Sequence, residues 1–372
     1  MDFFPINIAL GKAFCNRVKE RGLLKKYIEH GRHAVLIAPR RYGKTSLVNQ
    51  VLAELDLPYC IMELTMATSI GDVEQIIIKE VGELLYKILP KTSKAKQNLL
   101  KLFNWLNPEL VLTAFGQKLV LHPERVNIAT LENVAEILKK LDDAAGLLER
   151  KIVVVMDEFQ QLVDIGDDHN IEASIRHAMQ YSKHVTYIFL GSNRHMLLSM
   201  FNNKNRPFYN SCEMMKLERI SIVDYEPFIQ NAAEKQWKKS LSKDVLAKIF
   251  KLSELHPNYI NRICGYFWLI NEIPTLAHID QYWHDFVESK SAEFTQNILR
   301  LSKNQRNVLR YIASNPIKKI SGFDMCKAVQ LSESSIRQAV KKLMLQDYLY
   351  KNRDGLIDII DPALKYFISN FL

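Results

Sequence analysis

The chain has 372 residues, of which 48% are hydrophobic and 24% are charged, a composition typical of a globular protein with more than one domain. No apolar run approaches the roughly 20 residues that span a bilayer, the first residues lack the pattern of a secretory signal, and the five scattered cysteines argue against a disulfide framework or a zinc site. We therefore expect a cytoplasmic protein with no membrane partner. The net charge is +9, and residues 296–372 hold 13 Lys and Arg against 6 Asp and Glu, a local balance of +7.

Hydrophobic periodicity predicts alternating helices and strands in the first part of the chain. Helices are expected at residues 16–30, 45–55, 72–89 and 130–150. Short apolar runs predict strands at residues 33–37, 58–64, 152–156 and 184–190. Strands that alternate with helices at this spacing predict a parallel sheet covered by helices on both faces. Residues 91–123 interrupt the pattern, so we expect an insertion there in an α/β domain that spans residues 1–219.

The remainder of the chain predicts two further domains. Residues 220–295 have a helical pattern throughout and are expected to form an all-α lid domain. Residues 296–372, the basic terminal module, predict three short helices followed by a hairpin over residues 348–360 with Asp354-Gly355 at its turn. A basic module on a nearly neutral body suggests a polyanionic partner, although a solvated basic face that aids solubility has the same composition.

The segment between the strand at residues 33–37 and the helix at residues 45–55 has the pattern of a phosphate-binding loop. It reads Ala38-Pro39-Arg40-Arg41-Tyr42-Gly43-Lys44-Thr45, followed by Ser46. Phosphate binding requires backbone N–H groups that converge at a helix N-terminus, where the helix dipole also favours an anion. Gly43 permits the close backbone approach, Lys44 places a cation on the β- and γ-phosphates, and Thr45 offers a hydroxyl to Mg²⁺. The sequence therefore predicts that the protein binds ATP with Mg²⁺.

A pair of acidic residues supports this prediction. The strand at residues 152–156 ends in Asp157-Glu158, where Asp157 can hold the Mg²⁺ shell and Glu158 can act as the general base for hydrolysis of the γ-phosphate. The alternative is a strand that simply ends in two solvated acids. Beside a phosphate-binding loop we favour the catalytic interpretation, although a site of this kind can also bind ATP and hardly turn it over.

Several segments resemble the archaeal-type ATPase family, which belongs to the STAND branch of the AAA+-related P-loop NTPases. The likeness is carried by residues 38–47 and 155–160 and by four shorter matches: the F-x-x-R-x-x-E segment at residues 14–20, Gly191-Ser192-Asn193-Arg194, Arg206-Pro207-Phe208-Tyr209 and His256-Pro257. It covers nearly the whole chain except the insertion. The sequence departs from the family pattern at Ala38, where relatives have Gly, and in lacking a glycine directly before His256.

The resemblance implies roles for these matched residues. It implies that Arg17 lies near the adenine, and that Ser192 and Asn193 end a sensor strand whose Arg194 faces the γ-phosphate. It also implies that His256 and Pro257 belong to a lid that closes over the base. Alternatives remain open: Arg194 as a surface arginine at a helix start, His256 as a packed histidine, and Arg206 as either an arginine finger or the anchor of its own loop.

The terminal module has the pattern of a winged helix-turn-helix. Ser332 is positioned to cap a helix whose apolar stripe is Ile336, Val340 and Leu343. The opposite face carries the candidate DNA-binding residues Ser334, Arg337, Gln338 and Lys341, and the hairpin adds Lys351 and Arg353. In this motif the second helix enters the major groove and the wing contacts the backbone, which favours double-stranded DNA as the partner. The alternative is a winged helix that binds a protein.

The sequence thus predicts an α/β P-loop NTPase domain, a parallel sheet flanked by helices, followed by the all-α lid domain and the winged-helix domain. The leading hypothesis is an ATPase that acts as a nucleotide-driven switch coupled to DNA. One alternative is a DNA-binding regulator that holds ATP as a structural ligand with little turnover. Another is a scaffold that binds a protein partner. Self-association on ATP binding is compatible with each hypothesis, but no sequence feature demands it.

Overall fold

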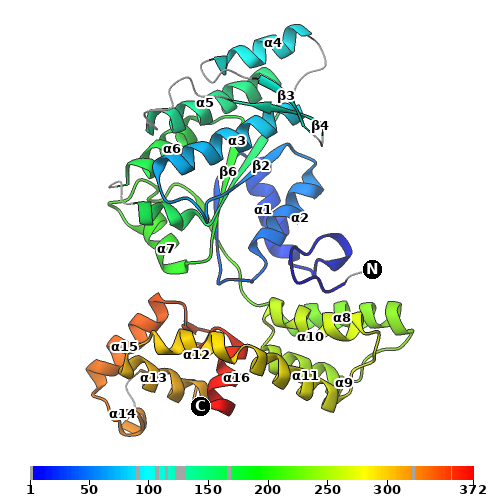
Figure 1. Ribbon diagram of the computed structural model, residues 1–372, viewed down its shortest axis with the longest axis vertical. Helices are drawn as coiled ribbons and strands as arrows, with labels where there is room; N and C mark the ends of the chain where they lie inside the picture. The colour runs from blue at the N-terminus through cyan, green and yellow to red at the C-terminus, as the bar shows by residue number, and fades with distance from the viewer. Residues whose placement is uncertain are drawn as a thin grey trace. The chain divides into compact units, whose positions relative to one another are not determined.

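The structure is a computed structural model that describes residues 3–88, 93–104, 109–113, 116–121, 131–165, 169–320, 323–352 and 354–372 (Figure 1). The chain folds as two units, one formed by Arg17–Glu218 and the other by Met1–Asn16 together with Arg219–Leu372. Each unit has its own hydrophobic core. Within the described ranges, no helix is both long enough and apolar enough to cross a membrane.

A parallel five-stranded sheet forms the centre of the first unit. Its order is β2 (Tyr59–Glu63), β5 (Ile152–Asp157), β6 (Val185–Gly191), β1 (Ala34–Ile37) and β7 (Glu213–Lys216). Every residue of β1, β5 and β6 is buried, which explains why these strands read as continuous apolar runs. The four predicted strands are all present. The edge strand β7 was not predicted, because charged residues occupy both of its ends.

Helices cover both faces of this sheet, as the sequence predicts. Figure 1 shows α1 (Val18–Glu29) and α2 (Lys44–Leu55) together, and α3 (Ile70–Ile88), α5 (Leu131–Leu147) and α6 (Asn170–Tyr181) stacked beside one another. Buried side chains of α3, α5 and α6 share one core with alternate residues of the central strands, among them Val154 and Phe189. The 3₁₀ helix η3 (Phe159–Ile165) and α7 (Arg194–Asn202) complete the unit.

The insertion at residues 91–123 contributes regular structure to the same unit. Its described part contains α4 (Ser93–Lys101) and an antiparallel hairpin of β3 (Glu109–Thr113) and β4 (Gly116–Val120). Leu119 of β4 is buried, and a Cβ added at Gly82 of α3 would lie 3.0 Å from the Leu119 carbonyl oxygen. The hairpin therefore packs closely on α3 because Gly82 has no side chain.

The helical region of the second unit contains α8 (Ile222–Trp237), α9 (Lys243–Ser253), α10 (Pro257–Leu269), α11 (Leu276–Ser289) and α12 (Ser291–Leu299). Residues near the N-terminus pack here and not in the α/β domain, to which the sequence analysis assigned them. Phe4 is buried against Phe228 and Trp268, and its carbonyl oxygen would lie 2.9 Å from a Cβ added at Gly265. The burial of these aromatic rings places the N-terminal segment in the second unit.

The terminal module contains α13 (Lys303–Ser314), α14 (Phe323–Val329), α15 (Glu333–Leu345), the hairpin of β8 (Leu349–Lys351) and β9 (Ile357–Ile359), and α16 (Pro362–Phe371). The Ser332 side chain accepts a hydrogen bond from the Ser335 backbone and caps α15, as predicted. The apolar stripe of Ile336, Val340 and Leu343 is buried. Ile317 forms an antiparallel bridge with Ile357, which extends the hairpin in a way that the sequence did not indicate.

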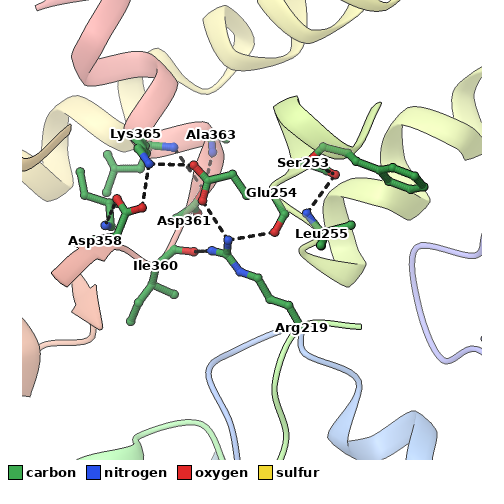
Figure 2. Close-up of polar contacts among 12 residues, drawn as sticks. Arg219, Ser253, Glu254, Leu255, Asp358, Ile360, Asp361, Ala363 and Lys365 are labelled. Atoms are coloured by element: carbon green, nitrogen blue, oxygen red, sulfur yellow. Dashed lines mark hydrogen bonds and ion pairs between the residues drawn. The ribbon is translucent and has the colours of Figure 1, made fainter. Parts of the chain in front are cut away.

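A network of ion pairs joins the helical region to the terminal module within the second unit (Figure 2). Arg219 donates from Nη1 to Glu254 Oε2 at 2.8 Å and from Nη2 to the Ile360 carbonyl oxygen at 2.8 Å. Lys365 of α16 donates to Glu254 Oε1 at 2.9 Å and to Asp358 Oδ2 at 2.8 Å. We call Arg219, Glu254, Asp358 and Lys365 the Arg219 network. It fixes the end of α9 to β9 and α16.

Candidate nucleotide site

The candidate site lies at the carboxyl edge of the sheet, where three adjacent strands end. Strand β6 lies between β1 and β5, and Ile37 is in register with Gly191. Because the strands are parallel, the loops that follow β1, β6 and β5 leave the sheet at the same edge. The loop after β1 carries the phosphate-binding sequence, Ser192-Asn193 follow β6, and Asp157-Glu158 stand at the end of β5. The fold therefore brings the three predicted groups together.

The loop after β1 has the backbone of a phosphate cradle. Gly43 directly precedes α2 in a left-handed conformation with φ 85°, and apart from its chain neighbours no atom lies within 4 Å of where its Cβ would be. The buried Lys44 folds back over the loop and donates to the carbonyl oxygens of Ala38 at 3.0 Å and Pro39 at 3.2 Å. The N–H groups of the first turn of a helix have no partner within the helix itself, so a phosphate at Gly43 fits this cradle.

Thr45 and Asp157 form a pair of oxygen ligands beside the cradle. Thr45 donates from Oγ1 to Asp157 Oδ2 at 3.0 Å, and the Glu158 backbone donates to Asp157 Oδ1 at 2.9 Å. Burial raises the pKa of the Asp157 carboxyl above its ordinary value. A buried carboxylate with hydroxyl and amide donors is stabilised further by a cation, and Mg²⁺ prefers such oxygen ligands. In the described part of the chain, no cluster of three His, Cys, Asp or Glu could hold a metal, so this pair would rely on phosphates and water to complete the shell.

Glu158 follows directly in a strained backbone conformation, with φ 51°. Its Oε2 accepts from the Ser192 hydroxyl at 2.8 Å, from the Ser192 backbone at 3.2 Å and from the Gln160 amide. Burial raises the pKa of Glu158, but the hydrogen bonds from Gln160 and Ser192 outweigh burial, and the pKa lies below its ordinary value. Gln160 is the last of residues 155–160, which carry the family resemblance, but the sequence analysis assigned it no role.

The arginines predicted near the nucleotide have different environments. Arg17 is buried, and its Nη2 donates to the carbonyl oxygens of Tyr42 at 2.8 Å and Glu218 at 2.9 Å. Its guanidinium therefore connects the phosphate loop at Tyr42 to the backbone at Glu218. Arg40 is exposed and donates from Nε to the Ser192 hydroxyl at 3.3 Å. Arg41 is exposed and has φ 62°. The contact of Arg17 with adenine stays a prediction.

The residues after β6 cap a helix. Asn193 accepts a hydrogen bond from the Met196 backbone at 3.1 Å and caps α7, and Arg194 is the first residue of that helix. Ser46, which the sequence analysis placed directly after the phosphate-binding segment, is half-buried in the first turn of α2. Arg194 therefore begins a helix at the carboxyl edge, and its contact with the γ-phosphate stays a prediction.

Arg206 anchors its own loop. It donates from Nε to Glu172 Oε2 at 3.2 Å, forms an ion pair through Nη2 with Glu172 Oε1, and lies 3.3 Å from His169 Nε2 through Nη1. The Arg206 side chain is 9% exposed and that of Glu172 is 1% exposed. This pairing favours the anchor over the arginine finger, because an exposed finger would first have to leave a buried carboxylate.

His256 and Pro257 lie in the second unit. His256 is buried and directly precedes α10, whose first residue is Pro257, and its ring packs on Tyr259 with centroids 5.0 Å apart. Proline is favoured at the first position of a helix, so the His256-Pro257 pair has a local structural role. A contact of His256 with the base stays a prediction.

The candidate DNA-binding residues gather on the surface of the terminal module. Ser334, Arg337, Gln338 and Lys341 are all exposed on α15, and Lys351 is exposed at the end of β8. Arg337 pairs with Glu333, with Nε 2.9 Å from Oε1, and this exposed pair is weak enough for a phosphate to displace. Arg353 lies outside the described residues. The Ile317–Ile357 bridge also brings the exposed Lys318 and Lys319 beside the hairpin, which sequence reasoning missed.

The parallel sheet, the loop at Gly43 and Lys44, and the acidic pair at the end of β5 define a protein with the fold of a P-loop NTPase. The chain is similar to the solved structure of the Walker-type ATPase PABY2304 of Pyrococcus abyssi, with a TM-score of 0.70 and 16% identity over 98% of this chain and 99% of that chain. It is also similar to the ORC2 protein of Aeropyrum pernix in ADPNP–ADP complexes, with a TM-score of 0.57 and 11% identity over 99% of this chain and 96% of that chain. No protein-family model and no curated protein matches the sequence.

Proposed function

We propose that this protein is a Mg²⁺-dependent ATPase that acts as a nucleotide-driven switch. The observation that carries the proposal is the contact of Thr45 with Asp157 beside Lys44, with Glu158 at the same edge of the sheet. These groups supply a cation for the phosphates, two oxygen ligands for Mg²⁺ and a carboxylate base, which are the parts that γ-phosphate hydrolysis needs. The likeness in fold to a Walker-type ATPase supports the same conclusion.

Each side chain has a defined task in this proposal. Lys44, now on the carbonyl oxygens of Ala38 and Pro39, moves to the β- and γ-phosphates when ATP enters. Thr45 and Asp157 would hold Mg²⁺, which would supply positive charge beside the phosphates. Glu158 orients the attacking water and accepts its proton. Hydrogen bonds from Gln160 and Ser192 outweigh the effect of burial on the pKa of Glu158, so the carboxylate is charged at neutral pH, as a base must be.

Replacing Glu158 with Gln separates binding from hydrolysis. The amide keeps the size of the side chain but cannot take a proton, so we expect Glu158→Gln to retain ATP and to lower kcat by about 100-fold or more. Binding of a fluorescent ATP analogue and release of phosphate are measured on the same preparation. Turnover that survives in this variant refutes the assignment of the base.

We further propose that the terminal module is a winged helix that binds duplex DNA. The exposed Ser334, Arg337, Gln338 and Lys341 share one helix, which suits the major groove, and the basic balance of the module suits the phosphate backbone. The Arg219 network joins the helical region to this module within one unit. A closure of the lid on ATP would therefore carry the DNA-binding surface with it.

Duplex binding should depend on these residues and on salt. We expect Arg337→Ala or Lys341→Ala to weaken affinity about tenfold and to reduce the slope of log affinity against log salt by about one for each lost phosphate contact. Lys239→Ala removes the same charge from an exposed position outside the module and serves as the control. Equal affinities for all variants would exclude this surface and leave a protein partner as the alternative.

A further inference from the structure

The positive charge of the terminal module is concentrated before α14. Residues 296–323 hold six Lys and Arg and no Asp or Glu, whereas residues 324–372, which include α15 and the hairpin, hold seven Lys and Arg against six Asp and Glu. The excess charge that suits a phosphate backbone therefore belongs chiefly to α13 and the segment after it, and not to α15.

Three of these cations share one face of α13. Lys303, Arg306 and Arg310 are separated by three and four residues, a spacing that places side chains beside one another on a helix. Lys303 and Arg310 are exposed and Arg306 is half-buried, and the exposed Arg300 directly precedes the helix. We call Lys303, Arg306 and Arg310 the α13 basic face.

We propose that the α13 basic face binds the phosphate backbone of a second duplex, so that the terminal module joins two DNA segments. This proposal rests on the DNA binding proposed above and deepens it, because it adds a contact surface separate from α15. Phosphate contacts carry no sequence information, so the second duplex would be bound whatever its sequence.

The α13 basic face has no acidic neighbour to neutralise it. Among the described residues, none forms an ion pair with Lys303, Arg306 or Arg310, whereas Arg337 of α15 pairs with Glu333. Like charges three and four residues apart on a helix repel one another. A bound polyanion would therefore remove this repulsion as well as add attraction.

The length of the α13 basic face matches a phosphate backbone. A helix rises about 1.5 Å per residue, so the three cations form a row about 10 Å long, and one strand of duplex DNA presents about three phosphates over that length. The face can therefore contact consecutive phosphates of one strand.

The α13 basic face and the candidate DNA-binding residues of α15 point to different sides of the module. Helices α13 and α15 pack against each other, Ile312 and Ile336 are buried in one core, and Gln305 Nε2 donates to Gln346 Oε1 at 3.0 Å. Because each helix turns its apolar stripe toward this shared core, the charged face of each is directed away from the other helix. A duplex on α15 therefore leaves the α13 basic face open to a second duplex.

The test asks whether the purified full-length protein joins two duplexes. A biotinylated duplex on beads captures a fluorescent duplex of unrelated sequence through the protein. We expect the triple variant Lys303→Gln/Arg306→Gln/Arg310→Gln to keep its affinity for a single duplex within about twofold and to lower capture of the second duplex about tenfold. The retained affinity for one duplex also shows that the variant is folded.

A second triple variant is the matched control. Lys238→Gln/Lys239→Gln/Lys243→Gln removes the same charge from exposed positions of the helical region and should capture as the wild type does. Capture that survives in the α13 variant overturns the proposal, because another surface or another copy of the protein would then hold the second duplex. An α13 variant that also loses affinity for the first duplex overturns it too, since α13 and α15 would then contact the same duplex.

Elution from heparin, a polyanion without bases, separates this proposal from the DNA binding of α15. The α13 triple variant should elute at lower salt than the control triple variant, and equal elution removes the face as a polyanion site. A face that binds heparin in a wild-type protein that captures no second duplex overturns the proposal and makes an acidic protein the partner. Unchanged single-duplex affinity in Arg337→Ala counts against α15 instead, and the heparin result stands without it.

Discussion

At the scale of single residues, two neighbouring carboxylates have opposite environments. Burial dominates at Asp157 and raises its pKa, whereas hydrogen bonds from Gln160 and Ser192 lower the pKa of Glu158. The first carboxylate is one that a cation would stabilise, and the second is stabilised in its charged form by hydrogen bonds from Gln160 and Ser192 and by the charge of Lys44. This difference is consistent with the proposed mechanism, in which Asp157 is the metal ligand and Glu158 is the base.

A substitution at Gly191 tests the packing behind Glu158. We expect Gly191→Ala to destabilise the protein by about 2 kcal/mol, because the new methyl group overlaps Gln160 and Leu197, and to lower kcat as Gln160 shifts. Urea unfolding and phosphate release measure the two effects. Gly22→Ala is the matched control, since Gly22 is in α1 with no atom within 4 Å of an added Cβ, and it should be neutral or stabilising. Equal stabilities for the two variants would contradict the close packing.

At the scale of elements, the parts that the sequence predicted are those with a local signal. The buried strands β1, β5 and β6 read as apolar runs, and the Ser332 cap and Gly43 loop follow rules of local geometry. Strand β7 was not predicted, because the charged Glu213 and Lys216 interrupt its apolar pattern. The Arg206–Glu172 and Arg219–Glu254 pairs escaped because residues 34 or 35 positions apart meet only through the tertiary fold.

The Arg219 network predicts that the ion pairs of Lys365 stabilise the junction of α9 with β9 and α16. Lys365 is 19% exposed and contacts both Glu254 and Asp358, so its loss leaves two neighbouring carboxylates with less compensation. We expect Lys365→Met to lower the free energy of unfolding by about 2 kcal/mol, as measured by urea denaturation. Lys290→Met removes an ion pair whose partners are 42% and 61% exposed, and it should cost less than about 1 kcal/mol. If the two variants lose equal stability, the network does not join these elements.

At the scale of the whole molecule, the candidate residues for nucleotide chemistry and the candidate residues for DNA binding belong to different units. Lys44, Thr45, Asp157 and Glu158 are in the unit Arg17–Glu218, whereas α15 and His256 are in the other. A ligand shifts a conformational equilibrium only through contacts that differ between the two states. A switch therefore requires contacts of ATP that differ between its two states, and the contact of His256 with the base, which the family resemblance implies, stays a prediction.

The central claim is tested most directly by Mg²⁺-dependent ATP hydrolysis with the purified protein, with and without duplex DNA, against Lys44→Ala as the blank. We predict turnover that is lost in this variant, lost on removal of Mg²⁺ with EDTA, and changed by DNA at low salt. Tight binding of ATP with no more phosphate release than Lys44→Ala would contradict the ATPase and make the nucleotide a structural ligand.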